Sequence, residues 1–211
     1  MQNWLTRHWV VGAGFMAAAL VALAPALVWP VAVSSTGGAS AGGTSTGAMP
    51  LAIFLLFLHS PVYMIHQVEE HTGDRFRRFA NQRLFHGLDA VSVPFVLVVN
   101  LLLVWGINLL ALYAGVIWGA GWGLSAPYLM LVNALSHIGA TYRFRCYNPG
   151  LVTGIFLFLP LSLLTLWAVG LSDGVIPHLL GLAVAVLLHL VLIGVVAVRY
   201  RWLAAPEAAR R

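Results

Sequence analysis

Residues 49–71 read MPLAIFLLFLHSPVYMIHQVEEH, an apolar run that ends directly in charged residues. A helix that crosses a bilayer needs roughly 20 mostly apolar residues at 1.5 Å per residue, which is about the length of this run. Similar runs occur along the chain, at about 9–33, 49–68, 90–113, 116–140, 150–170 and 174–198. The sequence therefore predicts an all-α, polytopic membrane bundle of about six transmembrane helices.

The composition agrees with lipid as the main solvent of the chain. Of the 211 residues, 61% are hydrophobic and 8% are charged, and the mean hydropathy is +0.91. An ordinary soluble domain carries about 25% charged residues, so this class is excluded. The net charge of +5 does not indicate a nucleic-acid partner, because the basic residues border apolar runs and form no separate basic face. We expect them to contact the headgroups of membrane lipids.

The basic residues, all arginines, predict which end of the bundle faces the cytoplasm, because short loops rich in basic residues stay on that side. They precede the first run and follow the second, fourth and sixth runs: Arg7; Arg75, Arg77, Arg78 and Arg83; Arg143 and Arg145; Arg199, Arg201, Arg210 and Arg211. These loops all fall on one side of a six-helix topology. Both termini are therefore predicted to lie inside.

Composition divides the chain into three parts. They are an N-terminal helix with a linker rich in glycine and serine (1–48, linker Ser34–Gly47), the bundle (49–200) and a basic cytoplasmic tail (201–211). Arg7, the first apolar run and Ala32-Val33-Ser34 also resemble a cleaved signal peptide. The apolar region of a signal peptide has about 7–15 residues, and this run is longer, so we expect a retained helix.

Ionisable side chains within a transmembrane run cost roughly 3 kcal/mol or more at the bilayer centre, so each one indicates a functional site. The second run ends with His66, Glu69 and Glu70. At about 100° per residue, the two carboxylates lie within about 60° of His66. Tyr63 shares this face, whereas His71 is expected to point about 140° away from His66. We therefore predict a site on one face of this helix, at its cytoplasmic end.

Two other runs supply polar residues at a similar depth. Asn133 and His137 are four residues apart on one face of the fourth run, and His189 lies in the cytoplasmic half of the sixth. Imidazole and carboxylate ligands suit Zn, Fe or Mn, and helical bundles build such sites from inward side chains of neighbouring helices. The predicted ligands of a divalent metal ion are His66, Glu69, Glu70, His137, Asn133 and His189, and the predicted catalytic residues are Glu69, Glu70 and Tyr63. The alternative is that these groups only hydrogen-bond neighbouring helices.

The string His66-Gln-Val-Glu69-Glu70 resembles the motif that defines the HXXEE family of bacterial integral membrane proteins. The stretches Asn133-Ala-Leu-Ser-His137 and Arg145-Cys-Tyr-Asn-Pro-Gly150 are also similar to that family. The resemblance covers about residues 50–170 and implies a multi-pass protein of the bacterial inner membrane. It supports the choice of His66, Glu69, Glu70, Asn133 and His137 without naming a substrate.

These features predict a membrane-embedded, metal-dependent enzyme that acts on a lipid-soluble substrate at the cytoplasmic leaflet. A redox metal would make it an oxidoreductase or hydroxylase, and zinc would make it a hydrolase. Two alternatives stay open: a metal-free isomerase or cyclase of a lipid that uses Glu69 or Glu70 as acid and base, and a small proton-coupled transporter. The expected partners are membrane lipids and a hydrophobic small molecule, and the sequence does not indicate an oligomeric state.

Overall fold

The computed structural model describes residues 4–28 and 49–208. Within these ranges the chain forms helices and short connections, and no strand occurs. The longer elements are α1 (Trp4–Val28), α2 (Leu51–His71), α3 (Arg75–Arg83), α5 (Trp105–Trp118), α6 (Ser125–Phe144), α8 (Leu159–Val169) and α9 (Ile176–Ala208). The shorter ones are η1 (Thr72–Asp74), α4 (Val93–Leu97), η2 (Val98–Val104), η3 (Ala120–Gly123), α7 (Leu151–Thr153) and η4 (Gly154–Phe158). The predicted all-α fold is confirmed.

Several of these helices have the length and composition of membrane spans. Five stretches are long and apolar enough to cross a bilayer: His8–Val28, Leu51–Arg83, Val93–Trp118, Leu151–Val169 and Ile176–Ala205. Helix α6 has 20 residues, but it is less apolar than α2 and carries Asn133 and His137. The structure thus supports a polytopic membrane protein, while the number of six spans and the orientation stay predictions.

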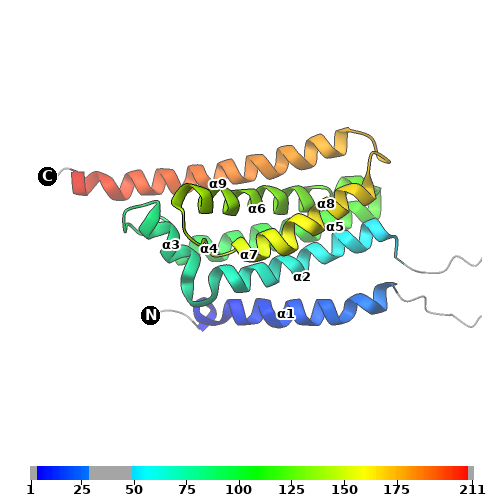
Figure 1. Ribbon diagram of the computed structural model, residues 1–211, viewed down its shortest axis with the longest axis horizontal. Helices are drawn as coiled ribbons and strands as arrows, with labels where there is room; N and C mark the ends of the chain where they lie inside the picture. Colours follow the sequence, from blue (N-terminus) through cyan, green and yellow to red (C-terminus); the bar gives the residue numbers. More distant parts are fainter. Residues whose placement is uncertain (1–3, 29–48, 209–211) are drawn as a thin grey trace, which may run out of the picture.

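Helix α2 is the central element of the bundle. It packs against α1, α5 and α8 along its length and also contacts α6 and α7, and Figure 1 shows these helices lying side by side with roughly parallel axes. In the most apolar part of its span 50% of the residues are buried, compared with 17–28% in the other four spans. A polar residue on α2 therefore has more protein neighbours than one on any of those helices.

One end of the bundle gathers most of the charge, and we call it the arginine-rich end. In Figure 1 the N-terminal end of α1, the junction of α2 with α3, the turn from α6 to α7 and the C-terminal end of α9 all lie there. The arginines described at this end are Arg75, Arg77, Arg78, Arg83, Arg143, Arg145, Arg199 and Arg201. This grouping agrees with the expected pattern of basic loops.

Some helix boundaries differ from those expected. Helix α6 begins at Ser125, later than the run at 116–140 predicted, because the chain first turns through Gly119 with φ +110 and the short helix η3. A Cβ on Gly123 would lie 2.5 Å from Cδ1 of Leu56 on α2, so a glycine is needed for this close approach. Helix α9 continues to Ala208, through the start of the predicted tail. The linker and the signal-peptide motif lie outside the described residues.

Candidate metal centre

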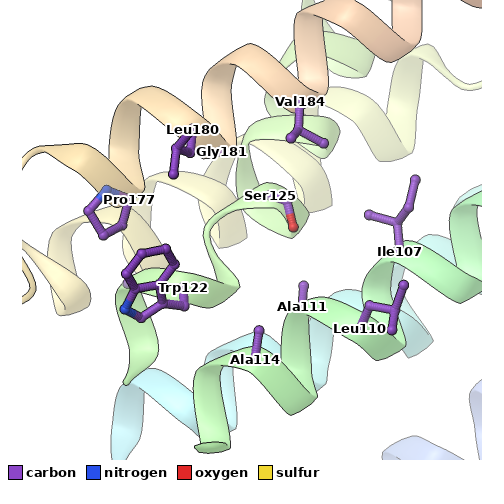
Figure 2. A pocket seen from close by; sticks show the side chains of 11 residues that line it. Ile107, Leu110, Ala111, Ala114, Trp122, Ser125, Pro177, Leu180, Gly181 and Val184 are labelled. Atoms are coloured by element: carbon purple, nitrogen blue, oxygen red, sulfur yellow. The ribbon is translucent and has the colours of Figure 1, made fainter. Parts of the chain in front are cut away.

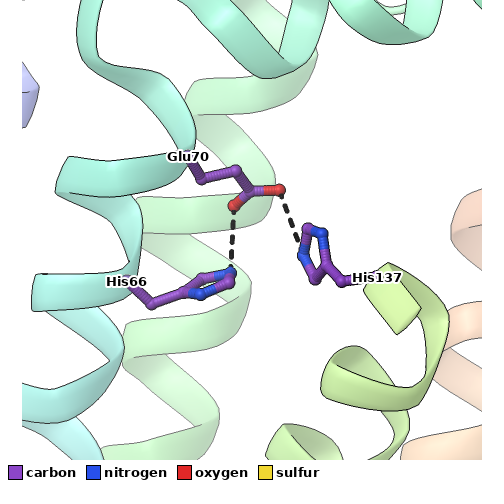
Figure 3. A group of neighbouring side chains, drawn as sticks. All are labelled: His66, Glu70 and His137. Carbon is purple, nitrogen blue, oxygen red and sulfur yellow. Dashed lines mark ion pairs between the residues drawn. The ribbon is translucent and has the colours of Figure 1, made fainter. Parts of the chain in front are cut away.

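Three ionisable side chains converge between α2 and α6, near the arginine-rich end. His66 and Glu70 lie one helical turn apart on α2, and His137 faces them from α6 (Figure 3). Nε2 of His66 is 3.5 Å from Oε2 of Glu70, and Nε2 of His137 is 3.7 Å from Oε1. Each residue offers one ligand atom, and these atoms all lie within 4.8 Å of one another. The predicted pairing of α2 with α6 is therefore present, with three of the proposed ligands in one group.

The group is buried and its polar atoms are poorly satisfied. The exposed fractions are 0% for His66, 5% for Glu70 and 4% for His137. Nε2 of His66 and Nδ1 of His137 have no hydrogen-bond partner among the described residues. A buried polar atom without a partner costs about 1–3 kcal/mol. A cation bound between the nitrogen and carboxylate oxygen atoms would remove this cost at His66 and balance the charge of Glu70.

His71 also contacts the group, although we expected it to point away from His66. Its Nε2 lies 3.1 Å from Oε2 of Glu70, and its ring packs 5.1 Å from that of Trp9 on α1. His71 is the residue directly after Glu70, so this contact does not require its ring to turn toward His66, and α2 ends at His71. Three imidazoles consequently surround the carboxylate of Glu70.

Glu69 lies outside the ligand group and binds the start of the helix formed by α7, η4 and α8. Its Oε1 accepts hydrogen bonds from the hydroxyl of Tyr147 at 2.7 Å and from the amides of Val152 and Gly150 at 3.1 and 3.3 Å. Its Oε2 accepts from the amide and hydroxyl of Thr153 at 2.7 and 2.6 Å. The first amides of a helix lack intrahelical acceptors, and an anion placed there satisfies them. Glu69 thus joins α2 to the helical segment formed by α7, η4 and α8.

The hydrogen bond to Glu69 changes the acidity of Tyr147, which lies in the turn between α6 and α7. Partial burial and the donated hydrogen bond raise the pKa of the Tyr147 phenol to about 12. Arg145, two residues before Tyr147, donates none of the hydrogen bonds described for Glu69. Arg145 adopts a left-handed conformation with φ 51° at the end of α6 instead.

Gly150 covers the histidine pair. It has φ +98, and a Cβ at this position would lie 2.6 Å from Cε1 of His137 and 2.7 Å from Cε1 of His66. The turn that carries it is anchored by Asn148, whose side-chain amide donates to the carbonyl of His137 at 3.4 Å. Asn148, Pro149 and Gly150 form a turn closed by the hydrogen bond from the amide of Leu151 to the carbonyl of Asn148, and α7 begins at Leu151. Only a residue without a side chain fits at position 150.

The other proposed site residues lie around the group or apart from it. The ring of Tyr63 is 5.7 Å from that of His66 and stacks on Phe158 at 5.3 Å. Oδ1 of Asn133, one helical turn before His137 on the same face of α6, is buried without a hydrogen-bond partner among the described residues. His189 on α9 bonds the carbonyl of Ala185 at 2.8 Å. Neither Asn133 nor His189 contributes to the contacts of Glu70.

A second buried network holds the opposite side of α2. The side-chain amide of Gln67 donates to Oδ1 of Asn100 at 3.0 Å, and Nε1 of Trp105 donates to Oε1 of Gln67 at 2.9 Å. Asn100 lies in η2, a π-helical segment, and also bonds the carbonyl of Val96. The network holds the rotation of α2, and the preceding residue, His66, faces α6. The sequence did not indicate Gln67 as a site residue. Its partner Asn100 was the available signal, because it is an asparagine within an apolar run.

A separate pocket does not contain these residues. A pocket of about 270 Å³ lies between α5, η3 and α9, at the other end of the bundle from the arginines. Figure 2 shows apolar side chains around it, among them Leu110, Trp122 and Leu180, each of which is also substantially exposed. Its lining contains no ionisable side chain. We therefore assign it to the lipid-facing surface and not to the site.

The fold and the buried group define a helical membrane protein with a histidine–carboxylate cluster between two helices. The model of a family described as "Protein of unknown function with HXXEE motif" matches residues 57–165, about half of the chain. The chain belongs to the HXXEE family, as its sequence indicated. The matched region includes His66, Glu70, His137 and Thr153. Comparisons with curated proteins and with solved structures give no match.

Proposed function

We propose that His66, Glu70 and His137 bind a divalent transition-metal ion, and that this centre catalyses a reaction on a lipid-soluble substrate. The observation that carries the proposal is the convergence of three buried ligand residues whose ligand atoms lie within 4.8 Å of one another. Among the described residues, Nε2 of His66 has no hydrogen-bond partner. Two ligand atoms about 2.1 Å from a tetrahedral ion lie about 3.4 Å apart. The separation of 3.5 Å between His66 and Glu70 agrees with this value.

The kind of ligand supports a catalytic metal. Calcium and magnesium prefer oxygen ligands, whereas two imidazoles and a carboxylate suit zinc, iron or manganese. Structural zinc sites usually have four protein ligands, and catalytic sites have three and leave a position open. A bound ion would supply Lewis-acid chemistry for hydrolysis if it is zinc, or oxidation if it is a redox metal. The three residues hold it, and Glu70 offsets part of its charge.

The surroundings of the group support an apolar substrate. The ring of Phe158 lies 4.3 Å from that of His66, and Tyr63 stacks on Phe158. Phe76 lies 6.3 Å from His137 on the side of the arginine-rich end. Aromatic walls around a buried centre favour a molecule that partitions into the membrane over a charged metabolite. Tyr63 is the polar side chain that we expect to contact such a substrate.

Metal analysis of the protein tests the proposal. We expect wild-type protein, purified in detergent and loaded with Zn²⁺, Fe²⁺ or Mn²⁺, to retain about one equivalent after desalting. The variants His66→Ala, Glu70→Gln and His137→Ala should lose it, because each removes a ligand. His189→Ala is the matched control, since His189 bonds a backbone carbonyl of its own helix. Metal-free wild type, or equal loss in the control, would overturn the metal centre.

Catalysis needs a separate measurement. Protein loaded with each metal is incubated with a membrane lipid extract, and the products are compared by mass spectrometry with those of His137→Ala. We expect, only with the loaded wild type, either the two fragments of a hydrolysed lipid or, with Fe²⁺, O₂ and an added two-electron reductant, a lipid that gains one oxygen atom. Identical products with the loaded wild type and with His137→Ala would contradict the enzymatic role. The protein would then bind a metal without catalysing this reaction.

The metal-free acid–base reaction is the second candidate, favoured by the contacts of Glu70. Three imidazoles lie within 3.7 Å of its carboxylate, and such a cluster can share and transfer a proton. A wild-type protein that binds no metal but isomerises a compound in the same extract would support this reading. Isomerisation leaves the mass unchanged, so chromatographic retention is the measurement.

A further inference from the structure

We propose that Glu69 and Thr153 are positioning residues that hold His66 as the tautomer protonated on Nδ1, so that Nε2 presents its lone pair to Glu70 and His137. The purpose of this arrangement, which is to orient a metal ligand, rests on the proposed metal centre. Its geometry, however, can be tested without any metal. It assigns different roles to the two adjacent carboxylates of the HXXEE motif.

The first step concerns the protonation of Glu69. Both of its oxygen atoms accept hydrogen bonds, from three backbone amides and from the hydroxyls of Tyr147 and Thr153. A protonated carboxyl would place its own hydrogen against one of these donors. An ionised carboxylate only accepts, and hydrogen bonds to it are the stronger, charge-assisted kind. Glu69 is therefore an ionised acceptor.

The second step concerns the single hydrogen of the Thr153 hydroxyl. Oγ1 of Thr153 lies 2.6 Å from Oε2 of Glu69 and 2.7 Å from Nδ1 of His66. If the hydroxyl donated to His66, Oγ1 and Oε2 would face each other as two acceptors without a hydrogen between them. The only arrangement that satisfies both short contacts has Thr153 donating to Glu69 and Nδ1 of His66 donating to Thr153.

The third step follows for the other ring nitrogen. A neutral imidazole with a hydrogen on Nδ1 has a lone pair on Nε2. In this structure Nε2 of His66 is buried without a hydrogen-bond partner and lies 3.5 Å from the carboxylate of Glu70. Two acceptors that face each other in a buried site repel unless a proton or a metal ion lies between them. Glu69 acts through Thr153, whereas Glu70 would lie beside a bound ion.

The tautomer can be measured directly. We expect ¹⁵N spectra of histidine-labelled wild type, recorded without metal at mildly alkaline pH, to show His66 protonated on Nδ1 and unprotonated on Nε2. The signal is assigned by its loss in His66→Gln. In Thr153→Val the acceptor for Nδ1 is absent, so the proton should move to Nε2, where Glu70 can accept it. Thr153→Ser keeps the hydroxyl and should retain the wild-type tautomer.

Metal affinity gives the second readout. Partners that orient a ligating histidine typically change metal affinity by about 10–100-fold, and we expect this loss in Thr153→Val with recovery in Thr153→Ser. Thr165→Val is the matched control, because Oγ1 of Thr165 is also buried on the same helical stretch but bonds the carbonyl of Leu161. It should bind metal like wild type.

The outcomes separate this proposal from the proposed function. A wild-type spectrum with the proton of His66 on Nε2 would overturn the proposed hydrogen-bond relay from Glu69 through Thr153 to His66, whether or not Thr153→Val folds. Wild type that has the expected tautomer but binds none of the three metals would overturn the metal centre and support the relay. Metal binding with equal affinity in wild type and a folded Thr153→Val would also overturn the relay.

Discussion

Nδ1 of His66 and Oγ1 of Thr153 are 2.7 Å apart, although the two residues are 87 positions apart in the chain. The contact links the ligand-bearing end of α2 to the first turn after the Asn-Pro-Gly loop. The same threonine also bonds Glu69 through its amide and its hydroxyl. One short segment therefore contacts a histidine and stabilises the neighbouring carboxylate with hydrogen bonds.

Gly150→Ala should weaken metal binding by at least about tenfold and destabilise the fold. The added Cβ would approach both imidazole rings within 2.7 Å, and a non-glycine residue at φ +98 costs about 1–3 kcal/mol. Isothermal titration with Zn²⁺ and thermal unfolding in detergent measure the two effects. Gly139→Ala on α6, where a Cβ meets no atom within 4 Å, should leave both unchanged or stabilise the helix slightly. Equal behaviour of the two variants would contradict the tight fit over the site.

Tyr147→Phe should lower stability at neutral pH, and the difference from wild type should disappear at alkaline pH. The pKa of Tyr147 is raised from 10.0 to about 12 in the folded protein, so the folded state favours the protonated phenol. The stabilisation is complete below about pH 10 and is lost as the pH rises through about 12. Unfolding temperatures across this range measure it. Tyr142→Phe, at a residue 87% exposed, should show no such convergence.

Gln67→Met should destabilise the bundle by about 1–3 kcal/mol, because it leaves Asn100 or Trp105 without a buried hydrogen-bond partner. Unfolding in dodecyl sulfate, followed by circular dichroism, gives the free energy. Gln82→Met, at an exposed position of α3, should stay within about 0.5 kcal/mol of wild type. Additive losses in Gln67→Met and Asn100→Leu would show that the two side chains do not act together.

His71→Ala should reduce metal affinity less than His137→Ala does. Nε2 of His71 contacts Glu70 at 3.1 Å, but His71 is not part of the three-residue ligand group. We expect about a tenfold loss for an orienting partner and no detectable binding without His137. Zn²⁺ titrations of both variants compare them. A larger loss in His71→Ala would make His71 a ligand.

Hydrophobic periodicity predicted the helices and the pairing of His66 and Glu70 with His137, because spans of similar length bring residues of similar depth together. It did not separate the roles of the two glutamates. Both lie within reach of His66 on an ideal helix, and the position of α7 decides which one faces the histidines. That position depends on contacts between distant segments.

The other differences depend on side-chain contacts that periodicity does not describe. His71 reaches Glu70 as its immediate neighbour in the chain. Thr153 was unremarkable in an apolar run, since threonine is tolerated in membrane helices and its two partners come from α2. Gly150 lies in the Asn-Pro-Gly turn, but its contact with the imidazole rings of His66 and His137 depends on how α6 and α7 meet.

The junction formed by Glu69 has a consequence for biosynthesis. The ribosome completes α2 long before it makes Thr153, so the carboxylate of Glu69 has no helix terminus to bind while the first half of the chain is inserted. His66 is likewise without its orienting hydroxyl, and His137 arrives only with α6. The proposed centre would therefore be assembled late, because a nascent chain that ends after α5 contains only two of its three ligands.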